Sequence, residues 1–260
     1  MPFVDANGLR IHYALSGGAS APVAMLSNSL GTNLTMWDLQ APALEKHFRL
    51  LRYDTRGHGR TDVPAGPYTL DHLGRDVLGL LDALKIDRVH FCGLSMGGMI
   101  GMWLGVNAPA RIHRLVLCST APKIGTPETW NPRIETIRKA GMNAVAPAVI
   151  ERWLTPEFRA RAPEASTALL GLLQIASPVG YSACCEAIRD ADLREAVASI
   201  RAPVQVIMGA RDPATPPADG RALAARIPGA KYAELEGSHL CNIESPGPFN
   251  AALLGFLNAV

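Results

Sequence analysis

Three polar residues that lie far apart in the chain have the types and the order that nucleophilic catalysis requires. Ser95 stands in Gly-Leu-Ser-Met-Gly at positions 93–97, a Gly-x-Ser-x-Gly pattern. Asp212 and His239 follow it, in that order, in the second half of the chain. A serine hydroxyl becomes an effective nucleophile when a histidine removes its proton and a carboxylate orients that histidine. The three residues therefore predict acyl transfer through a covalent intermediate on Ser95.

The segments on either side of Ser95 predict the local structure that holds such a nucleophile. Residues 88–92 are an apolar run typical of a buried strand, and residues 98–104 combine small and apolar side chains typical of a packed helix. A strand, a tight turn with serine at its tip and then a helix form the nucleophile elbow of an α/β hydrolase. The turn is strained, so glycine is expected on both sides of the serine, where a Cβ would clash. The alternative is a glycine-rich turn in which Ser95 only caps the helix.

Position in the chain distinguishes Asp212 and His239 from the other acids and histidines. The order in α/β hydrolases is Ser, then Asp or Glu, then His, with the acid directly after a strand. His239 lies in a loop after the last predicted strand, and Asp212 directly follows the strand before it. Asp219, the nearest rival acid, begins a predicted helix and fits a helix cap better. His58, in Arg-Gly-His-Gly, is another loop histidine that could lie near the site, although a structural role is its ordinary interpretation.

Two backbone N–H groups are expected to stabilise the oxyanion of the tetrahedral intermediate. One belongs to Met96, directly after the nucleophile. The other is expected in the loop at 28–32, Asn-Ser-Leu-Gly-Thr, which follows a predicted strand at 23–27, and we choose the N–H of Leu30. Backbone donors leave no side-chain signature, so a simple glycine turn stays open as the alternative for this loop.

Short apolar runs alternate with helix-length segments along most of the chain. This alternation predicts a mostly parallel central sheet with helices on both faces, the α/β-hydrolase fold. Asn7-Gly8 between apolar residues predicts an antiparallel hairpin at one edge of the sheet. The predicted central strands are residues 23–27, 48–53, 89–93, 115–118, 204–208 and 232–235, and the predicted helices of the same region are 37–47, 69–84, 98–106, 219–227 and 246–258.

The alternation stops between residues 122 and 192, where the pattern indicates several helices and no strand. A helix start at 126–128 is followed by helical segments at 134–142, 145–154, 167–175 and 181–188. A helical block between two strands of one sheet is expected to cover the carboxyl edge of that sheet. We therefore expect a core domain made of residues 1–121 and 193–260 and an inserted helical cap domain made of residues 122–192.

Composition excludes several classes of partner. A net charge of +2 is too small to indicate nucleic acid or an anionic membrane. Apolar runs stay short of the roughly 18 residues that span a bilayer, and the first residues lack a signal-peptide pattern. Five cysteines without metal-binding spacing indicate a reduced, cytoplasmic protein with no metal and no cofactor. The oligomeric state stays open.

Several motifs together resemble one family, the 3-oxoadipate enol-lactonases, which are small α/β hydrolases of the β-ketoadipate pathway of aromatic degradation. These motifs are Asn-Ser-Leu-Gly-Thr at 28–32, Tyr-Asp-Thr-Arg-Gly-His-Gly at 53–59, Gly-Leu-Ser-Met-Gly-Gly at 93–98, Gly-Ala-Arg-Asp at 209–212, Gly-Ser-His at 237–239 and Thr-Trp-Asn at 129–131. The first is the most specific, because many relatives carry His-Gly at its start. Pro132 and the pair Cys184-Cys185 fall in the cap, which is the part that diverges most.

The resemblance implies that Ser95, Asp212 and His239 are nucleophile, acid and base, with Leu30 and Met96 as oxyanion donors. The implied substrate is a five-membered enol-lactone with an acetate arm, which water opens to 3-oxoadipate through an acyl-enzyme. The implied partner is thus a small anionic lactone, with no nucleic acid and no membrane.

The anionic arm of such a substrate is expected to meet an arginine under the cap. Trp130 and Arg133 are three residues apart and would share a helical face, so we predict that they bind the substrate. A solvated surface cation is the alternative for Arg133. The other cationic residues of the cap that could serve are Lys123, Arg138, Lys139 and Arg152.

Other functions fit the same three residues. A general carboxylesterase, a cofactor-free perhydrolase and a hydrolase of carbon–carbon bonds use the same arrangement. A haloalkane dehalogenase is disfavoured because it needs Asp where Ser95 stands. Outside enzymes, a hydrolase-fold receptor would bind its ligand with very slow turnover.

Overall fold

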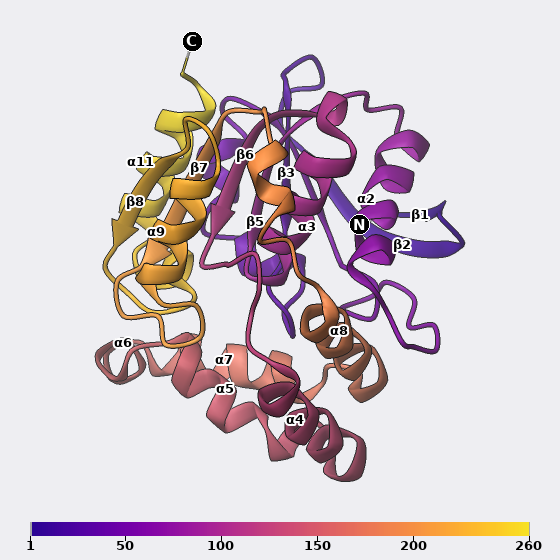
Figure 1. The fold of residues 1–260 in the computed structure, drawn as a ribbon, viewed down its shortest axis with the longest axis vertical. Coiled ribbons are helices and arrows are strands. Elements are labelled where there is room, and N and C mark those ends of the chain that lie inside the picture. Colours follow the sequence, from indigo (N-terminus) through magenta and orange to yellow (C-terminus); the bar gives the residue numbers. More distant parts are fainter. Residues whose placement is uncertain (1, 260) are drawn as a thin grey trace.

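Eight strands form one sheet in the order β1-β2-β4-β3-β5-β6-β7-β8 (Figure 1). The structure is a computed structural model that describes residues 2–259. The strand β2 pairs antiparallel with β1 and β4, and all other pairs are parallel. The strands are β1 Phe3–Ala6, β2 Leu9–Ser16, β3 Val23–Ser27, β4 Arg49–Tyr53, β5 Val89–Leu94, β6 Ile112–Cys118, β7 Val204–Gly209 and β8 Lys231–Leu235. The predicted α/β-hydrolase fold is confirmed.

The hairpin between β1 and β2 turns at the predicted Asn7-Gly8. Both residues have positive φ, 51° and 73°, as a two-residue hairpin turn with the right-handed twist of its strands requires. Ala6 and Leu9 pair directly across this turn.

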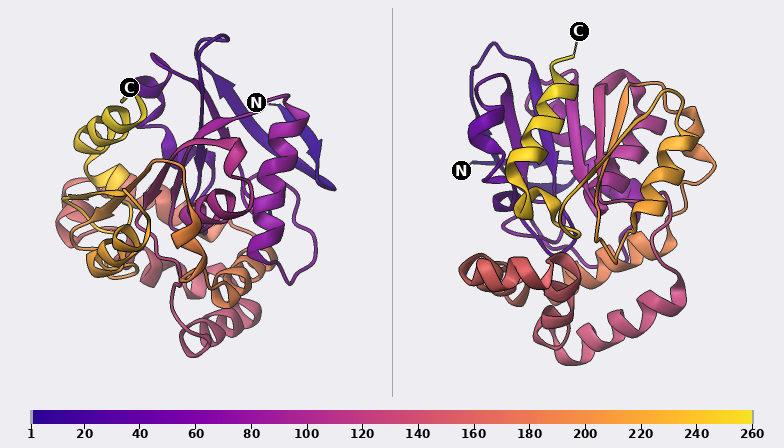
Figure 2. Two further views of the ribbon diagram at one scale, coloured as in Figure 1. Left: turned by 45° about the horizontal axis from the view of Figure 1, so that its top comes forward. Right: turned by 90° about the vertical axis from the view of Figure 1, so that its left-hand side faces the viewer.

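Helices cover both faces of the sheet (Figure 2). Helices α2 and α3 pack on each other and α9 packs against β7, while α1 packs against α11 on the opposite face. Every residue of β7 is buried, as expected for an inner strand with helices on both faces, and Gln205 is its one polar side chain. The helices outside the segment between β6 and β7 are α1 Ala41–Leu44, α2 Leu70–Ala83, α3 Met96–Asn107, α9 Pro217–Arg226, α10 Cys241–Glu244 and α11 Pro246–Leu257. The 3₁₀ turns that accompany the sheet are η1 Leu34–Trp37, η2 Pro109–Arg111 and η4 Ala196–Ser199.

The helix predicted over residues 37–47 is wrong. This segment contains the end of η1 and the four-residue helix α1. Pro42 explains the break, because its ring cannot continue a helix from the preceding turn. The side chain of Asn33 accepts the N–H of Thr35 and so begins η1 in place of a longer helix.

Five α-helices lie between β6 and β7, across the carboxyl ends of the parallel strands (Figure 1). They are α4 Pro127–Ala140, α5 Ala146–Trp153, α6 Pro156–Arg161, α7 Pro163–Gln174 and α8 Pro178–Asp190, with the 3₁₀ turn η3 Met142–Ala144 after α4. Helix α4 packs against α8, and α5 packs against α7. The predicted limits of the cap, 122 and 192, fall in the connections on either side of this helical block.

The predicted helices of this block are displaced by proline. Helices α7 and α8 begin four and three residues before the predicted starts at 167 and 181, and α6 was not predicted. Proline fits the first helical position, where its missing N–H has no partner to lose. Pro132 does not divide α4, contrary to the separate segment predicted from residue 134. In the described part of the chain, no single helix is long and apolar enough to cross a membrane; α7 and α8 pass only when taken together, and they bend by 93°.

Candidate active site

Ser95 lies at the sharp turn between β5 and α3, as the sequence pattern predicts. Its φ of 58° and ψ of −114° place a residue with a Cβ in a conformation that only a strained turn imposes. A Cβ on Gly93 would collide with the backbone of Gly97, and a Cβ on Gly97 would collide with the backbone of Ser27. The two glycines are therefore required by backbone contacts, and the turn lifts the serine side chain into a cavity.

The structure brings Asp212 and His239 together at the ends of β7 and β8. The Nδ1 atom of His239 lies 2.8 Å from Oδ2 of Asp212, and each residue is only 3% exposed. The other oxygen of Asp212 accepts the N–H groups of Ala214 and Thr215, at 2.8 and 3.1 Å. The hydroxyl of Thr215 donates to Oδ2 at 2.8 Å.

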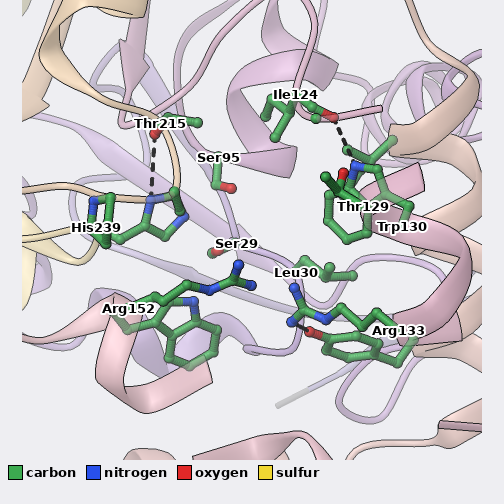
Figure 3. A pocket seen from close by; sticks show the side chains of 16 residues that line it. Ser29, Leu30, Ser95, Ile124, Thr129, Trp130, Arg133, Arg152, Thr215 and His239 are labelled. Carbon is green, nitrogen blue, oxygen red and sulfur yellow. Dashed lines mark hydrogen bonds between the residues drawn. The ribbon is translucent and has the colours of Figure 1, made fainter. Parts of the chain in front are cut away.

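The environment of Asp212 keeps it ionised. Burial raises the pKa of Asp212, but the charge and hydrogen bond of His239 and the hydrogen bonds from Thr215 lower it, and the net pKa lies below the usual range. An ionised Asp212 can only accept, so the proton of His239 is on Nδ1 and Nε2 is the free base. Ser95 and His239 line the same cavity of about 230 Å³ (Figure 3).

The loop 28–32 follows β3 and lies beside the elbow. Gly97 donates its N–H to the carbonyl of Asn28 at 3.1 Å, and Gly31 donates its N–H to Nε2 of His58 at 2.8 Å. The N–H groups of Leu30 and Met96 have no acceptor among residues 2–259, and Met96 is the first residue of α3. A free N–H at a helix N-terminus is suited to a developing negative charge.

His58 does not line the cavity beside Ser95. Its Nε2 accepts from Gly31 and its Nδ1 donates to the carbonyl of Arg56 at 3.2 Å. Burial lowers the pKa of His58, which favours the neutral ring that this pair of hydrogen bonds requires. The structural interpretation of this histidine therefore holds, and its function is to fix the loop that carries Leu30. The sequence motif does not indicate this contact, because the loops that carry Gly31 and His58 are neighbours only after β3 and β4 have paired in the sheet.

Side chains of the helical block form the opposite wall of the cavity (Figure 3). The guanidinium of Arg133 lies 5.4 Å from the ring centre of Trp130 and 5.3 Å from that of Tyr181. Arg133 also donates to the hydroxyl of Tyr181. Burial raises the pKa of Tyr181, so its phenol stays protonated. Two flat rings therefore hold one cation in the wall of the cavity that Ser95 also lines.

Arg152, on α5, lines the cavity together with Arg133. Burial lowers the pKa of Arg152, and the positive charge of Arg133 lowers it further. Within residues 2–259, neither arginine forms an ion pair with a carboxylate. Two neighbouring cations without a counter-ion are suited to an anionic ligand.

The other three cations of the helical block that the sequence offered as candidates are engaged elsewhere. Arg138 pairs with Glu186 at 2.8 Å and Lys139 with Glu135 at 3.6 Å. Lys123 donates to two backbone carbonyls at the end of α8. Of the candidate cations, Arg133, which was predicted to bind the substrate, and Arg152, which was one of several possibilities, line the cavity. Tyr181 and Trp153 also line the cavity and were not predicted. In the part of the chain that the structure describes, no cluster of three or more His, Cys, Asp or Glu could hold a metal ion.

Comparisons with known proteins agree with this geometry. The family model of the α/β-hydrolase fold matches residues 25–148. Two relatives from Acinetobacter baylyi, 3-oxoadipate enol-lactonase 2 and 3-oxoadipate enol-lactonase 1, are 42% and 37% identical; the matches cover 96% and 98% of this chain and 94% and 96% of theirs. The crystal structure of the enol-lactonase from Burkholderia xenovorans LB400 is 47% identical and superposes with a TM-score of 0.98 over 99% of this chain and 100% of that chain.

The chain belongs to the 3-oxoadipate enol-lactonase family of α/β hydrolases. The resemblance noted in the sequence is thereby confirmed. Enol-lactonases are hydrolases that act on ester bonds, and this chain is an enzyme of that class. The match runs through the helical block as well as the sheet, since it covers nearly the whole chain.

Proposed function

We propose that this enol-lactonase family member hydrolyses 3-oxoadipate enol-lactone to 3-oxoadipate through an acyl-enzyme on Ser95. One observation carries the proposal: a single cavity joins Ser95 and His239 to two arginines that form no ion pair with a carboxylate among residues 2–259. The enol-lactone offers both groups that such a cavity would hold, a reactive carbonyl and a carboxylate arm. Residues 122–192 act as the cap over this cavity.

Acylation begins when Nε2 of His239 takes the proton of Ser95 and the serine oxygen attacks the lactone carbonyl. The N–H groups of Leu30 and Met96 hold the oxyanion of the tetrahedral intermediate. The ring C–O bond then breaks, His239 returns the proton to the departing enol oxygen, and the enol tautomerises to a ketone. An enol is a better leaving group than a simple alcohol, so this step needs less help than ester cleavage.

Deacylation reverses the roles of the same groups. Water gives a proton to Nε2 of His239 and attacks the acyl carbonyl, and the collapse of the second intermediate releases a carboxylic acid and restores Ser95. Asp212 holds the Nδ1 proton throughout and stabilises the imidazolium. The sum is one lactone plus one water giving one 3-oxoadipate, with no cofactor.

The carboxylate arm is bound by Arg133 and Arg152, while the rings of Trp130 and Trp153 enclose the apolar ring atoms. Charge-assisted hydrogen bonds to a carboxylate are stronger than neutral ones, so the cap selects an anionic substrate. Tyr181 keeps Arg133 in place through its hydroxyl.

Steady-state kinetics test this proposal. We expect kcat/KM for the anionic enol-lactone to exceed that for neutral p-nitrophenyl acetate by about 10²-fold or more, since a charged hydrogen bond contributes about 1.5–3 kcal/mol and two are available. Ser95→Ala, the control, should remove turnover of both substrates. Equal or better turnover of the neutral ester would instead indicate a general carboxylesterase. Tight binding of the lactone with very slow turnover would indicate a receptor.

We also propose that the protein works in a reducing, cytoplasmic setting. All five cysteines are free and buried, and the sulfurs of Cys92 and Cys118 stay unbonded although they lie 3.7 Å apart. Reduced thiols are typical of the cytoplasm. A thiol reagent added to protein unfolded directly from its native cells should find five thiols, and a smaller number would contradict the proposal.

A further inference from the structure

The loop that carries His239 is hydrogen-bonded, on both sides of the histidine, to one short segment of the cap. The hydroxyl of Ser238 donates to the carbonyl of Arg152 at 2.9 Å. The N–H of Leu240 donates to the carbonyl of Trp153 at 3.0 Å. The two neighbours of the proposed base are therefore tied to two cap residues whose side chains line the cavity.

Glu244, on α10, bridges the same two segments with its carboxylate. Its Oε1 accepts the N–H of Ser238 at 2.8 Å and the N–H of Thr155 at 3.1 Å. Its Oε2 accepts the hydroxyl of Thr155 at 2.6 Å. Glu244 is only 6% exposed, and a buried carboxylate is costly unless donors satisfy it. Three donors from two separate segments satisfy this one.

Thr155 extends the bridge into the cap. It is the N-cap of α6, and its hydroxyl oxygen accepts the N–H of Phe158 at 3.2 Å while its proton goes to Glu244. Arg161, at the other end of α6, donates to the backbone carbonyl of Glu244 at 3.0 Å. Both ends of α6 thus depend on α10, and the direction of the chain between α5 and α6 is fixed relative to the histidine loop.

We propose that Glu244 is a positioning residue that holds the histidine loop and cap residues 152–155 in one fixed geometry. Proton transfer at His239 and recognition of the substrate carboxylate by Arg152 then depend on the same carboxylate. Glu244 itself lies outside the cavity lining and does not touch the substrate. The inference rests on the proposed function, because the position of Arg152 matters only for an anionic substrate.

Replacing the carboxylate of Glu244 with an amide tests separately whether it positions the histidine loop and whether it positions Arg152. Glu244→Gln keeps the size of the side chain but exchanges one acceptor oxygen for an NH₂ group, so one donor loses its acceptor if the NH₂ replaces Oε2 and two lose it if the NH₂ replaces Oε1. A shift of the histidine loop lowers kcat for every substrate. A shift of the cap segment moves Arg152 and raises KM for anionic substrates alone.

The experiment measures kcat and KM of the full chain with the enol-lactone and with p-nitrophenyl acetate, with active sites counted from the initial burst of p-nitrophenol. We expect Glu244→Gln to lower kcat per active site about tenfold on both substrates, because small misplacements of a catalytic group have large effects. We expect KM for the lactone to rise about fivefold, and KM for the ester to change less than about twofold, because only the lactone bonds to a cation. Glu236→Gln alters an exposed carboxylate just before the same loop and should change each constant less than about twofold.

A merely structural role gives a different result. It would lower the free energy of unfolding and the number of active sites while leaving kcat and KM per site unchanged, and that outcome overturns the proposal. If Glu244→Gln does not fold, Thr155→Val removes the hydroxyl that donates to Glu244 and accepts from Phe158, and it should raise KM for the lactone about fivefold, since one hydrogen bond contributes about 1 kcal/mol. An unchanged KM in folded Thr155→Val also overturns the proposal.

The neutral ester keeps this inference separate from the proposed function. If the chain does not hydrolyse the lactone, the proposed substrate is wrong, but the kcat of Glu244→Gln on p-nitrophenyl acetate still tests whether Glu244 positions His239. An undiminished kcat on that ester contradicts the inference even when the lactone is the substrate.

Discussion

The two walls of the active-site cavity hold their functional groups in different ways. The core wall, defined here as Ser95, Asp212, His239 and Leu30, lies in the connections that follow β5, β7, β8 and β3. The serine is fixed by a strained turn, the acid by N–H groups of its own loop, and the histidine by its hydrogen bond to the acid on the neighbouring loop. The histidine loop is in addition hydrogen-bonded to the cap through Ser238 and Leu240, so the geometry of His239 also depends on the facing cap segment.

The cap wall, defined as Trp130, Arg133, Arg152 and Tyr181, lies on the helices α4, α5 and α8. Of its two cations, Arg133 is held by two aromatic rings and one phenol hydroxyl, and neither Arg133 nor Arg152 pairs with a carboxylate in the described residues. In the proposed mechanism the core wall performs the reaction on any ester, and the cap wall decides which ester is bound. Substitutions in the two walls should therefore give opposite kinetic signatures.

Asp212→Asn is the largest expected change and belongs to the core wall. The amide cannot hold His239 in the required tautomer, and the equivalent change in the serine-protease template lowers kcat by about 10⁴-fold. We expect the same loss with the enol-lactone and with p-nitrophenyl acetate, with KM little altered. A loss confined to the anionic substrate would show that the core wall also takes part in selectivity.

Arg152→Met tests the cap wall with the opposite signature. Removing a charge-assisted hydrogen bond of about 1.5–3 kcal/mol should raise KM for the lactone about 10- to 100-fold. KM for p-nitrophenyl acetate should stay within about twofold of the wild-type value. Arg138→Met is the control, because its guanidinium is bound to Glu186 outside the cavity, and it should leave KM for both substrates within about twofold. If Arg152→Met raises KM equally for both substrates, Arg152 does not bind the substrate carboxylate.

The two walls also differ in how far the sequence predicts them. Ser95, Asp212 and His239 could be named because each follows a strand, and strand ends meet at one edge of a parallel sheet. Gly93 and Gly97 are required by backbone collisions within a few residues, so the motif itself carries the geometry. The structure brings these segments together as expected, and it leaves their catalytic roles to kinetics.

The cap wall depends on packing between helices that are distant in the sequence. Arg133 could be paired with Trp130 from their spacing on α4, but Tyr181 joins them only because α8 packs against α4. Arg152 could not be preferred to the other cap cations, since no local pattern shows which face of α5 points to the cavity. The predicted start of α7 was also wrong, because the helix begins at Pro163 and not at residue 167.

Gly31 lies where the two walls meet, and its substitution tests whether they are independent. Its φ is +83°, and a Cβ would press on Leu173 and Tyr181 of the cap. Gly31→Ala should move the loop that carries Leu30 and lower kcat about tenfold on both substrates, because a left-handed conformation costs about 1–2 kcal/mol with a Cβ. Gly171→Ala, where nothing lies near the added carbon, is the matched control and should be silent. If kcat is unchanged in Gly31→Ala, the loop that carries Leu30 tolerates displacement from the cap side.

The smallest expected effect is on the pH dependence of the free energy of unfolding, to which His58, the hydrogen-bond partner of Gly31, contributes. Burial holds the pKa of His58 below its usual value, near 6.5 in an unfolded chain. Between these two values the unfolded chain binds more protons, so the free energy of unfolding falls as the pH falls below about 6.5, by up to about 1.4 kcal/mol per pH unit for one group.

His58→Gln removes this contribution, so its free energy of unfolding should vary less steeply with pH just below about 6.5 than that of the wild type. His90, whose pKa burial and the neighbouring His113 lower to about 4, contributes to both proteins and cancels in the difference. His47→Gln, which changes an exposed ring, should keep the wild-type slope. Urea unfolding at several pH values measures all three slopes. Parallel curves for wild type and His58→Gln would mean that His58 binds its proton equally well in the folded chain, which the hydrogen bond from Gly31 to Nε2 does not allow.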